Sequence, residues 1–582
     1  MEYKSENKIC QNCKKDFTIE SEDFNFYEKI KVPPPTFCPK CRMQRRLAWR
    51  NERTLYKRKC DLCNKNIIAM YNESVSFPVY CNECWWGDGW DAKDYARDYD
   101  FNQSFFEQYK KFIDVVPRLA LWQRNMVDSD YTNACGESKN VYLSYSVVAG
   151  SENVFYSKNI DKSGDIVDCL NIKEGQNLYE NIEGEKNYNC QYLLLSKNCI
   201  DSYFLVDCVN CSDCVLSHNL RNKKFYIRNR QYSKEDYFNE LEKLNLKSRA
   251  SREVLLEEFI KIKQSAIYRF ANIVRSINST GNNLLNVKNC HNCFDIYNAE
   301  NLKYCHRAFA SFKDSMDVSY AMVSELIYEY TTGCLNDYNV KFSYSAINSV
   351  RNADYTECCR NCTNIFGCIS LNNVENAIFN KVYSEEEYKI LRTRIIEQMS
   401  SMPFIDKAGR IYKYGEFFPI EISPWAYNET LAQEFFPLTK EEAEKKGYAW
   451  REPQDKNFNI TMPAHEIPDD LNNVNKSILD EVLGCIHEEK CSHQCTSAFR
   501  LTDYELRFYE KHHIPIPILC SNCRYYERFS QVPPLKLYHR QCTCNLSNHG
   551  HEAQCQNEFE TPYAPERPEK VYCENCYNQE IY

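Results

Sequence analysis

The central part of the chain places polar turn residues and short β-forming runs at a fixed period. Asn or Asp recurs at every twelfth position and is followed by runs such as VFY, IVD or LYE. Asn and Asp favour turns, whereas Val, Ile, Tyr and Phe favour strands, so the pattern predicts a stacked parallel β-solenoid. One period is too short for a full coil, so each period is interpreted as half of a roughly 24-residue coil. The repeating positions are Asn153, Asp165, Asn177, Asn189, Asp201 and Asp213.

This central pattern is duplicated. Residues 208–237 match residues 359–388 at a constant offset of 151, with Cys211 on Cys362 and Tyr232 on Tyr383. A duplicated solenoid-like centre is therefore expected.

Helices are expected after each solenoid block. Ser384 and Thr439 each precede Glu by three residues, which is typical of a capping box, and Ser233 opens a helix equivalent to the first. Apolar residues keep near-helical spacing over 255–277 and predict one long amphipathic helix that packs on the solenoid or on a partner. Residues 451–480, rich in Pro, Asn and Asp, are typical of a linker.

Paired cysteines occur near both ends, and the two sets are copies of one module. The N-terminal pattern recurs at an offset of 482, and its second half recurs after a ten-residue insertion. Two CxxC-type pairs can hold one tetrahedral Zn2+, which predicts two zinc sites in each module and about four structural zinc ions in all. The predicted ligands are Cys10, Cys13, Cys38, Cys41, then Cys60, Cys63, Cys81, Cys84, then Cys491, Cys495, Cys520, Cys523, and finally Cys542, Cys555, Cys573 and Cys576.

The C-terminal copy departs from the pattern at the first pair of each site. Cys491 and Cys495 are separated by three residues, and Cys542 and Cys555 are separated by twelve. The first ligand of the fourth site therefore stays open. The alternatives are Cys544, His549 and His551.

Other roles for the cysteines are less favoured. The chain opens with MEYKSENKIC, without a signal-like segment, and 33 cysteines cannot all be paired, so reduced thiols in a cytoplasmic protein are preferred over disulfides. Four protein ligands close the metal shell and leave no position for a substrate. In the centre, cysteines one or two periods apart suit a stacked core. Cys208, Cys211 and Cys214 with His218 form a weaker iron–sulfur alternative.

The terminal modules resemble known zinc domains. The string of CxxC, Phe17, Glu22, Phe26, Tyr27 and Pro35, then Cys38, Cys41 and Arg42, resembles the zinc-ribbon or treble-clef domains of small bacterial proteins. With GEFFP at 415–419 and YNET at 427–430, the whole chain is similar to an uncharacterised cysteine-rich family of reduced-genome, uncultivated bacteria. The resemblance implies zinc and a bacterial cytoplasm and brings no activity with it.

Charge adds one candidate binding surface. The net charge of −9 argues against the whole surface binding nucleic acid. However, arginines follow the second cysteine pair, where a helix would align them with a phosphate backbone. The alternative is a solvated basic face that pairs with the acidic segment 88–100. The candidate nucleic-acid contacts are Arg42, Arg45, Arg46, Arg50 and Arg53. Trp85, Trp86 and Trp90 are interpreted as a small core around the second zinc rather than a stacking surface.

The sequence thus predicts a multidomain, mainly β protein with duplicated zinc-ribbon or treble-clef modules around a duplicated solenoid-like centre and accessory helices. The favoured function is a non-catalytic zinc-binding structural or adaptor protein with an unknown macromolecular partner, protein or nucleic acid. Alternatives are an RNA or DNA binder and a polymer-active enzyme with a solenoid groove. No apolar run suggests a membrane span, and an oligomer is open. The expected divisions are 1–100, 101–232, 233–283, 284–383, 384–480 and 481–582.

Overall fold

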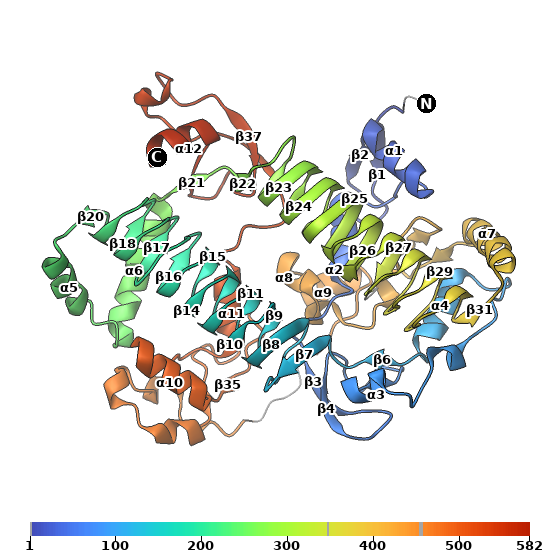
Figure 1. The fold of residues 1–582 in the computed structure, drawn as a ribbon, viewed down its shortest axis with the longest axis horizontal. Coiled ribbons are helices and arrows are strands. Elements are labelled where there is room, and N and C mark those ends of the chain that lie inside the picture. Colours follow the sequence, from blue (N-terminus) through green and yellow to red (C-terminus); the bar gives the residue numbers. More distant parts are fainter. Residues whose placement is uncertain (1–2, 346–347, 453–457) are drawn as a thin grey trace.

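The chain is mostly β and is built around two large parallel sheets, each curled on itself. The computed structural model describes residues 3–345, 348–452 and 458–582. In Figure 1 the first curled sheet (β7–β20, teal to green) lies on the left and the second (β22–β31, lime to yellow) lies on the upper right. The cysteine-rich modules and the remaining helices pack around and between them.

Strands of the first curled sheet are short. They are β7 (Gln123–Val127), β8 (Cys135–Tyr142), β9 (Tyr145–Val148), β10 (Glu152–Phe155), β11 (Lys158–Asp161), β12 (Gly164–Val167), β13 (Leu170–Lys173), β14 (Gln176–Tyr179), β15 (Ile182–Glu185), β16 (Tyr188–Leu194), β17 (Tyr203–Val206), β18 (Ser212–His218), β19 (Lys224–Ile227) and β20 (Arg230–Gln231).

The second curled sheet has longer strands in its first half. They are β22 (Ile273–Val274), β23 (Gly281–His291), β24 (Cys293–Lys303), β25 (His306–Met322), β26 (Glu325–Leu335), β27 (Tyr338–Tyr344), β28 (Arg351–Asp354), β29 (Thr363–Phe366), β30 (Glu375–Ile378) and β31 (Lys381–Val382).

One turn of each curled sheet takes a single sequence period in its regular part. Glu152 pairs with Gly164 and Lys158 with Leu170, so strands on two sides of the coil both find their parallel partner one period later. The prediction of a coil twice as long is therefore wrong. A residue with positive φ stands at every third position along β10–β18, and these sharp corners let so few residues close a turn.

The same geometry explains the polar pattern of the sequence. The Asn and Asp positions have φ near +50°, a conformation that these two residues tolerate better than most others. Their side chains also bond one turn onward: Asn352 Nδ2 donates to Asn364 Oδ1 (3.1 Å), and Asn364 Nδ2 donates to Asn376 Oδ1 (3.0 Å). Side chains such as Val154, Ile160 and Ile166 fill the interior.

Helices cover the ends of the sheets and connect them. Two begin at the predicted caps, with Ser384 before α7 (Glu385–Ser401) and Thr439 before α9 (Lys440–Lys445). Ser233 likewise precedes α5 (Lys234–Lys243). Further helices are α4 (Phe105–Ile113), α6 (Arg249–Ser265) and α8 (Leu431–Phe435).

The long helix predicted over 255–277 is wrong at its C-terminal end. Helix α6 ends at Ser265, and the chain then becomes extended in β21 (Ile267–Arg269). Strand β21 pairs in parallel with β38 (Lys570–Tyr572), and β22 already belongs to the second curled sheet. Apolar residues at helical spacing thus serve strand pairing here, because a tertiary partner overrides the local pattern. Of the predicted linker, residues 453–457 lie outside the described residues, and η4 (Ala464–Glu466), η5 (Leu471–Asn473) and η6 (Lys476–Asp480) follow.

The cysteine-rich modules are small αβ units at both ends of the chain. The N-terminal ones contain β1 (Glu6–Ile9), β2 (Asp16–Ile19), α1 (Ser21–Ile30), α2 (Pro39–Leu47), β3 (Tyr56–Lys59), β4 (Asn66–Ala69), β5 (Val79–Tyr80) and α3 (Asn82–Trp86), followed by η1 (Ala92–Tyr95) and β6 (Arg118–Leu119). The C-terminal ones contain β34 (Leu483–Gly484), β35 (Ala498–Phe499), α10 (Asp503–His512), α11 (Ser521–Phe529), β36 (Tyr538–Gln541), β37 (Glu558–Thr561), β38 and α12 (Glu574–Ile581).

The modules dock crosswise, meaning that the N-terminal module contacts the second curled sheet and the C-terminal module contacts the first. Helix α2 packs on β25 and β26, and α11 forms ion pairs with the first curled sheet. None of the helices in the described ranges is long and apolar enough to cross a membrane.

Candidate metal centres

Each cysteine tetrad combines two cysteines of a loop with two at a helix N-terminus, and in the first two tetrads this loop is a tight turn. In the first tetrad, Cys10 and Cys13 lie in the turn between β1 and β2, where Lys14 has φ +59°. Cys38 is the N-cap of α2, and Cys41 lies in its first turn. Backbone N–H groups and the helix dipole favour thiolates at this position.

Within the described residues, cysteines of the two terminal regions come together in four tetrads, two at each end. In each, a backbone N–H of the helix N-cap cysteine donates to the first cysteine sulfur at 3.2–3.3 Å. Neighbouring sulfurs lie 3.8 to 4.0 Å apart, as in Cys13–Cys38 (3.8 Å) and Cys555–Cys573 (4.0 Å). A zinc tetrahedron with Zn–S bonds of about 2.3 Å has sulfur–sulfur edges of about 3.8 Å. The tetrads are Cys10, Cys13, Cys38, Cys41; Cys60, Cys63, Cys81, Cys84; Cys485, Cys495, Cys520, Cys523; and Cys542, Cys555, Cys573, Cys576.

The thiols of the second tetrad differ in pKa, and burial raises the pKa of Cys81. Burial opposes ionisation of Cys60, yet hydrogen bonds from the backbone of Cys63 and Cys81 lower its pKa to about 7. The 32 cysteines whose side chains the structure describes are all free thiols. The spacing of the sulfurs and the free thiols therefore fit one divalent metal ion in each of the four tetrads.

The third tetrad differs from the sequence prediction in its first residue. Cys485, rather than Cys491, completes the set with Cys495, Cys520 and Cys523, and it accepts the N–H of Cys520 (3.2 Å) as Cys10 accepts that of Cys38. Spacing alone favoured Cys491, because a loop inserted after Cys485 places it nearer to Cys495. Cys491 instead belongs to an overlapping group with His487, His493 and Cys523.

In the fourth tetrad the structure places Cys542 among the four sulfurs. The three alternative ligands lie beside it. Cys544 Sγ is 3.2 Å from His549 Nδ1, and His551 Nε2 is 3.4 Å from Cys576 Sγ.

The arginines proposed as nucleic-acid contacts are enclosed in the protein. Arg42 Nε donates to Asp317 Oδ2 (2.8 Å), while Arg46 Nη1 donates to Asp317 Oδ1 (3.1 Å) and Glu329 Oε2 (3.2 Å). Arg42 is 2% exposed and Arg46 is fully buried. Asp317 and Glu329 stand one period apart, on successive turns of the second curled sheet. Because the helix pitch of about 5.4 Å is close to the strand spacing of about 4.8 Å, arginines four residues apart reach carboxylates one turn apart.

The remaining arginines of the set are also engaged. Arg45 is fully buried and donates to Glu416 Oε2 (3.1 Å), Arg50 Nε donates to Glu52 Oε1 (2.7 Å), and the side chain of Arg53 is 12% exposed and stacks on α11. Burial removes these guanidinium groups from contact with a phosphate backbone, so the folded chain does not present the basic face that the nucleic-acid interpretation requires of this patch. The alternative pairing with the acidic segment 88–100 is wrong, because the partners lie elsewhere.

The C-terminal module repeats the two-arginine contact. Arg524 Nε lies 2.9 Å from Asp168 Oδ2, Arg528 Nη2 lies 2.9 Å from Asp168 Oδ1, and Arg528 Nη1 donates to Glu180 Oε1 (2.7 Å). Asp168 and Glu180 are again one period apart. The sequence offered a signal for this role, since Arg524 and Arg528 are the two arginines that the second copy keeps.

The central cysteines belong to the interior of the curled sheets. Cys208, Cys211 and Cys214 are at most 1% exposed, and each sulfur lies 3.3–3.5 Å from the backbone carbonyl two residues earlier. His218 turns to Asn219 Oδ1 (2.9 Å), so the structure does not bring it to these sulfurs as a fourth ligand.

Two tryptophans contribute to a core at the second tetrad. Trp85 is 7% exposed and packs at 4.9 Å from the ring of Trp90, in a cluster with Cys60 and Cys81. Trp86 lies outside it, half exposed.

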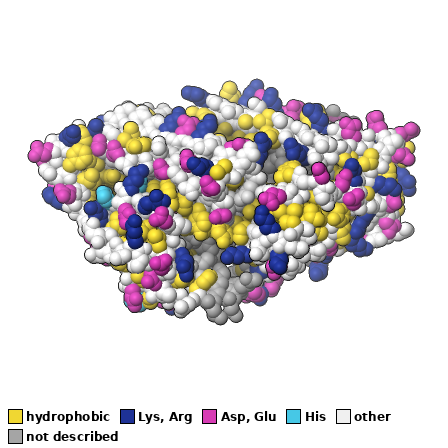
Figure 2. Space-filling model, turned by 60° about the horizontal axis from the view of Figure 1, so that its bottom comes forward, with side chains coloured by type: hydrophobic (Ala, Val, Ile, Leu, Met, Phe, Trp, Pro, Cys, Tyr) yellow, Lys and Arg dark blue, Asp and Glu magenta, His cyan; other side chains and the backbone are white. Residues whose placement is uncertain are grey.

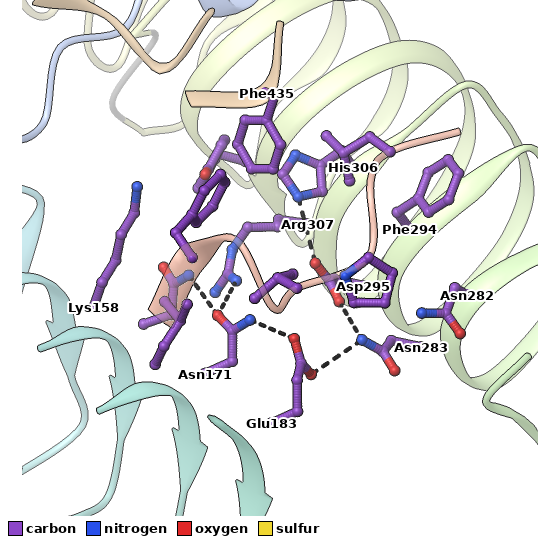
Figure 3. Close-up of a pocket in the computed structure, with 17 residues that line it drawn as sticks. Lys158, Asn171, Glu183, Asn282, Asn283, Phe294, Asp295, His306, Arg307 and Phe435 are labelled. Carbon is purple, nitrogen blue, oxygen red and sulfur yellow. Dashed lines mark hydrogen bonds and ion pairs between the residues drawn. The ribbon is translucent and has the colours of Figure 1, made fainter. Parts of the chain in front are cut away.

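A small cavity with polar and apolar walls lies between the two curled sheets (Figure 3). Glu183 of the first sheet and Asp295 of the second share Asn283, whose Nδ2 lies 3.2 Å from Glu183 Oε2 and 2.9 Å from Asp295 Oδ1. His306 Nε2 lies 3.4 Å from Asp295 Oδ2. The volume of about 30 Å3 suits one water molecule and is too small for a sugar ring.

The two carboxyl groups of this cavity differ in pKa. Burial and the nearby Asp295 raise the pKa of Glu183 to about 7. Burial also acts on Asp295, but the hydrogen bond to His306 and the charge of Arg307 hold its pKa below the ordinary value. Burial lowers the pKa of His306. Asp295 is therefore the more acidic of the two, and Glu183 keeps its proton to a higher pH than an ordinary glutamate does.

No protein-family model matches this chain, and neither the curated proteins nor the solved structures compared with it gave a match.

Proposed function

We propose that this protein is a zinc-dependent structural or adaptor protein, in which two terminal zinc-ribbon or treble-clef modules, each with two zinc sites, hold two short-period β-solenoids in one assembly for a macromolecular partner. The observation that carries the proposal is the crosswise docking. The metal tetrad at Cys38 and Cys41 sets the start of α2, whose Arg42 and Arg46 form ion pairs with the second curled sheet. The tetrad at Cys520 and Cys523 does the same for α11 on the first.

Metal binding and sheet arrangement are coupled in this design. A structural zinc site contributes about 10–16 kcal/mol of apparent binding free energy to its fold. Without it, a module of this size has little core of its own, and the helix that carries the two arginines loses its N-terminal anchor. The metal therefore holds the long-range contact as well as the local one.

The regular sheet surfaces suit an extended partner. Asn286 Nδ2 donates to Asn298 Oδ1 (3.0 Å) and Asn289 Nδ2 donates to Asn301 Oδ1 (3.1 Å), so exposed carboxamides form rows along the second curled sheet. Rows with a fixed spacing are rigid. Little conformational entropy of this protein is therefore lost when a partner binds them, and the affinity is reduced little on that account.

The two alternative functions find less support. On the face drawn in Figure 2, basic and acidic side chains are interspersed, which is unlike a continuous basic track for nucleic acid. The carboxylate pair in the inter-sheet cavity has room for water only, so a polymer-active enzyme would need another site.

Metal removal tests the proposal. Purified protein is treated with a strong chelator at neutral pH, and backbone hydrogen exchange is followed by mass spectrometry before and after zinc is restored. We expect faster exchange in β10–β14 and β25–β26 as well as in the modules, with recovery on zinc addition. Exchange that changes in the modules alone, with a constant radius of gyration, would contradict the scaffold role of the metal.

A further inference from the structure

The overlapping ligand group around Cys523 sets the third tetrad apart. The ligand atoms of His487, Cys491, His493 and Cys523 all lie within 4.8 Å of one another. Cys491 Sγ is 3.7 Å from Cys523 Sγ, while Cys485 Sγ is 3.9 Å from Cys523 Sγ on the side of the tetrad. Both distances match the roughly 3.8 Å edge of a zinc–sulfur tetrahedron. Cys523 is thus a corner of two tetrahedral sets.

The two histidines present ring nitrogens that need a partner. Nδ1 of His487 and Nδ1 of His493 are buried, and neither finds a hydrogen-bond partner in the part of the chain that the structure describes. A buried polar atom without a partner costs free energy, so such atoms point to a ligand. The two rings lie 5.6 Å apart by their centroids, which lets both nitrogens face one point.

Neighbouring side chains orient these rings. His493 stacks on Tyr526, with centroids 5.9 Å apart and an angle of 15°. Nε2 of His487 faces Glu527 Oε1 at 3.9 Å, on the side away from Nδ1. This carboxylate is too distant for the hydrogen bond that usually supports a metal-bound histidine, and it contributes a charge contact on the far side of the ring.

We propose that this region is a dinuclear zinc-type centre with Cys523 as the bridging thiolate. One ion is held by Cys485, Cys495, Cys520 and Cys523, and the second by His487, Cys491, His493 and Cys523. Charge favours the pair. Four thiolates around one divalent ion leave two excess negative charges, whereas adding a second divalent ion with one more thiolate and two neutral imidazoles leaves one.

The first tetrad is an internal reference for a single ion. Its knuckle is the short Cys10–Cys13 pair, whereas the loop 486–494 that carries the extra ligands interrupts the corresponding pair Cys485–Cys495. The inserted loop is therefore the source of the second site. In a competing arrangement, one ion exchanges Cys491 for Cys495 and the histidines play no part.

Metal counting separates the two arrangements. Intact protein is analysed by native mass spectrometry and elemental analysis, alongside the double variant His487→Ala/His493→Ala. We expect at least five ions per chain in the parent protein and one fewer in the double variant, with the remaining fold unchanged by circular dichroism. The matched control, His465→Ala, replaces an exposed histidine and should keep the full count. Equal counts in the parent and the double variant would overturn the proposal.

Cadmium NMR tests the bridge itself. In protein loaded with 113Cd, the dinuclear centre predicts two signals, one typical of four sulfurs and one of two sulfurs with two nitrogens, with scalar coupling between them through Cys523. Cys491→Ser should remove the second signal and the coupling while the first remains. A single uncoupled signal from this region in the parent protein would refute the bridge. These readouts concern the number and coupling of ions, so their failure leaves the scaffold role of the four tetrads to be judged separately.

Discussion

Helix α2 on the second curled sheet and helix α11 on the first are held by equivalent contacts, but the α2 docking site is closed more completely. Both place two arginines four residues apart against an aspartate and a glutamate one sheet turn apart. At the α2 site both carboxylates are fully buried, whereas the side chain of Glu180 at the α11 site is 15% exposed.

A third arginine makes the difference larger. Arg45 adds two buried contacts at the α2 site, to Glu329 and Glu416. Its counterpart at the α11 site, by the repeat offset, is Glu527, whose side chain is 49% exposed. The N-terminal module is thus held by a buried network of several ion pairs, whereas the C-terminal module has the two-arginine contact without a third arginine. The two arginines that both modules share make the common docking contact, and Arg45 adds further contacts at the α2 site alone.

The largest effect is expected from breaking the shared pair at the better enclosed site. Arg46→Met takes one guanidinium away from two fully buried carboxylates, Asp317 and Glu329, and should lower the free energy of unfolding by about 3–5 kcal/mol, although Asp317 keeps Arg42 and Glu329 keeps Arg45. Arg528→Met should cost less, because Glu180 can be hydrated. Urea unfolding of both variants measures the difference.

The control for this pair is Arg507→Met, which removes an arginine whose side chain is 65% exposed. It should change stability by less than about 0.5 kcal/mol. If Arg46→Met behaved like this control, the buried pair would not hold α2 to the sheet.

A smaller effect is expected from removing the unshared arginine. Arg45→Met should cost about 2–4 kcal/mol, since Glu329 keeps Arg46 and Glu416 keeps both donors of Thr36. Glu527→Gln, at the equivalent position of α11, should be close to neutral. Comparable losses in the two variants, measured by urea unfolding, would mean that the two sites are not as different as their burial indicates.

Part of this architecture could be predicted from the sequence, because metal ligation requires cysteines at short, recognisable spacings. The cysteine pairs predicted the metal modules, and fifteen of the sixteen proposed cysteine ligands lie in the tetrads that the structure gathers. The remaining one, Cys491, was chosen by spacing. Because a loop is inserted in the C-terminal copy, the structural equivalent of Cys10 is Cys485. Sequence spacing alone does not show which cysteine of such a loop lies beside the helix in the folded protein.

The arginine set shows where sequence reasoning failed. A run of arginines after a zinc knuckle indicates a basic surface only if no other part of the protein packs on it. Here Asp317 and Glu329, which lie far along the chain in the second curled sheet, pair with these arginines. The internal repeat held the missing clue, since Arg42 and Arg46 recur as Arg524 and Arg528 while the others do not. The period of twelve residues was identified correctly, but the predicted length of one coil was twice the observed length. Corners with positive φ at every third residue are needed to close so short a turn, and such tight packing of corners is rarely expected of residues other than glycine.

The smallest predicted effect concerns the contact that both docking sites hold in place, the one between the two curled sheets. The folded protein raises the pKa of Glu183 from 4.5 to about 7. Between these values the folded state keeps a proton that the unfolded chain has lost, so stability falls as the pH rises through this window and levels off above it. Glu183→Gln removes the titrating proton, so relative to the parent protein it should gain about 1–3 kcal/mol between pH 5 and pH 8. Glu185→Gln, on the same strand and facing Lys197, is the matched control and should show no such gain. Urea unfolding of the three proteins at each pH, with zinc held constant, gives the comparison; a pH-independent difference for Glu183→Gln would show that this carboxyl is already ionised between the sheets.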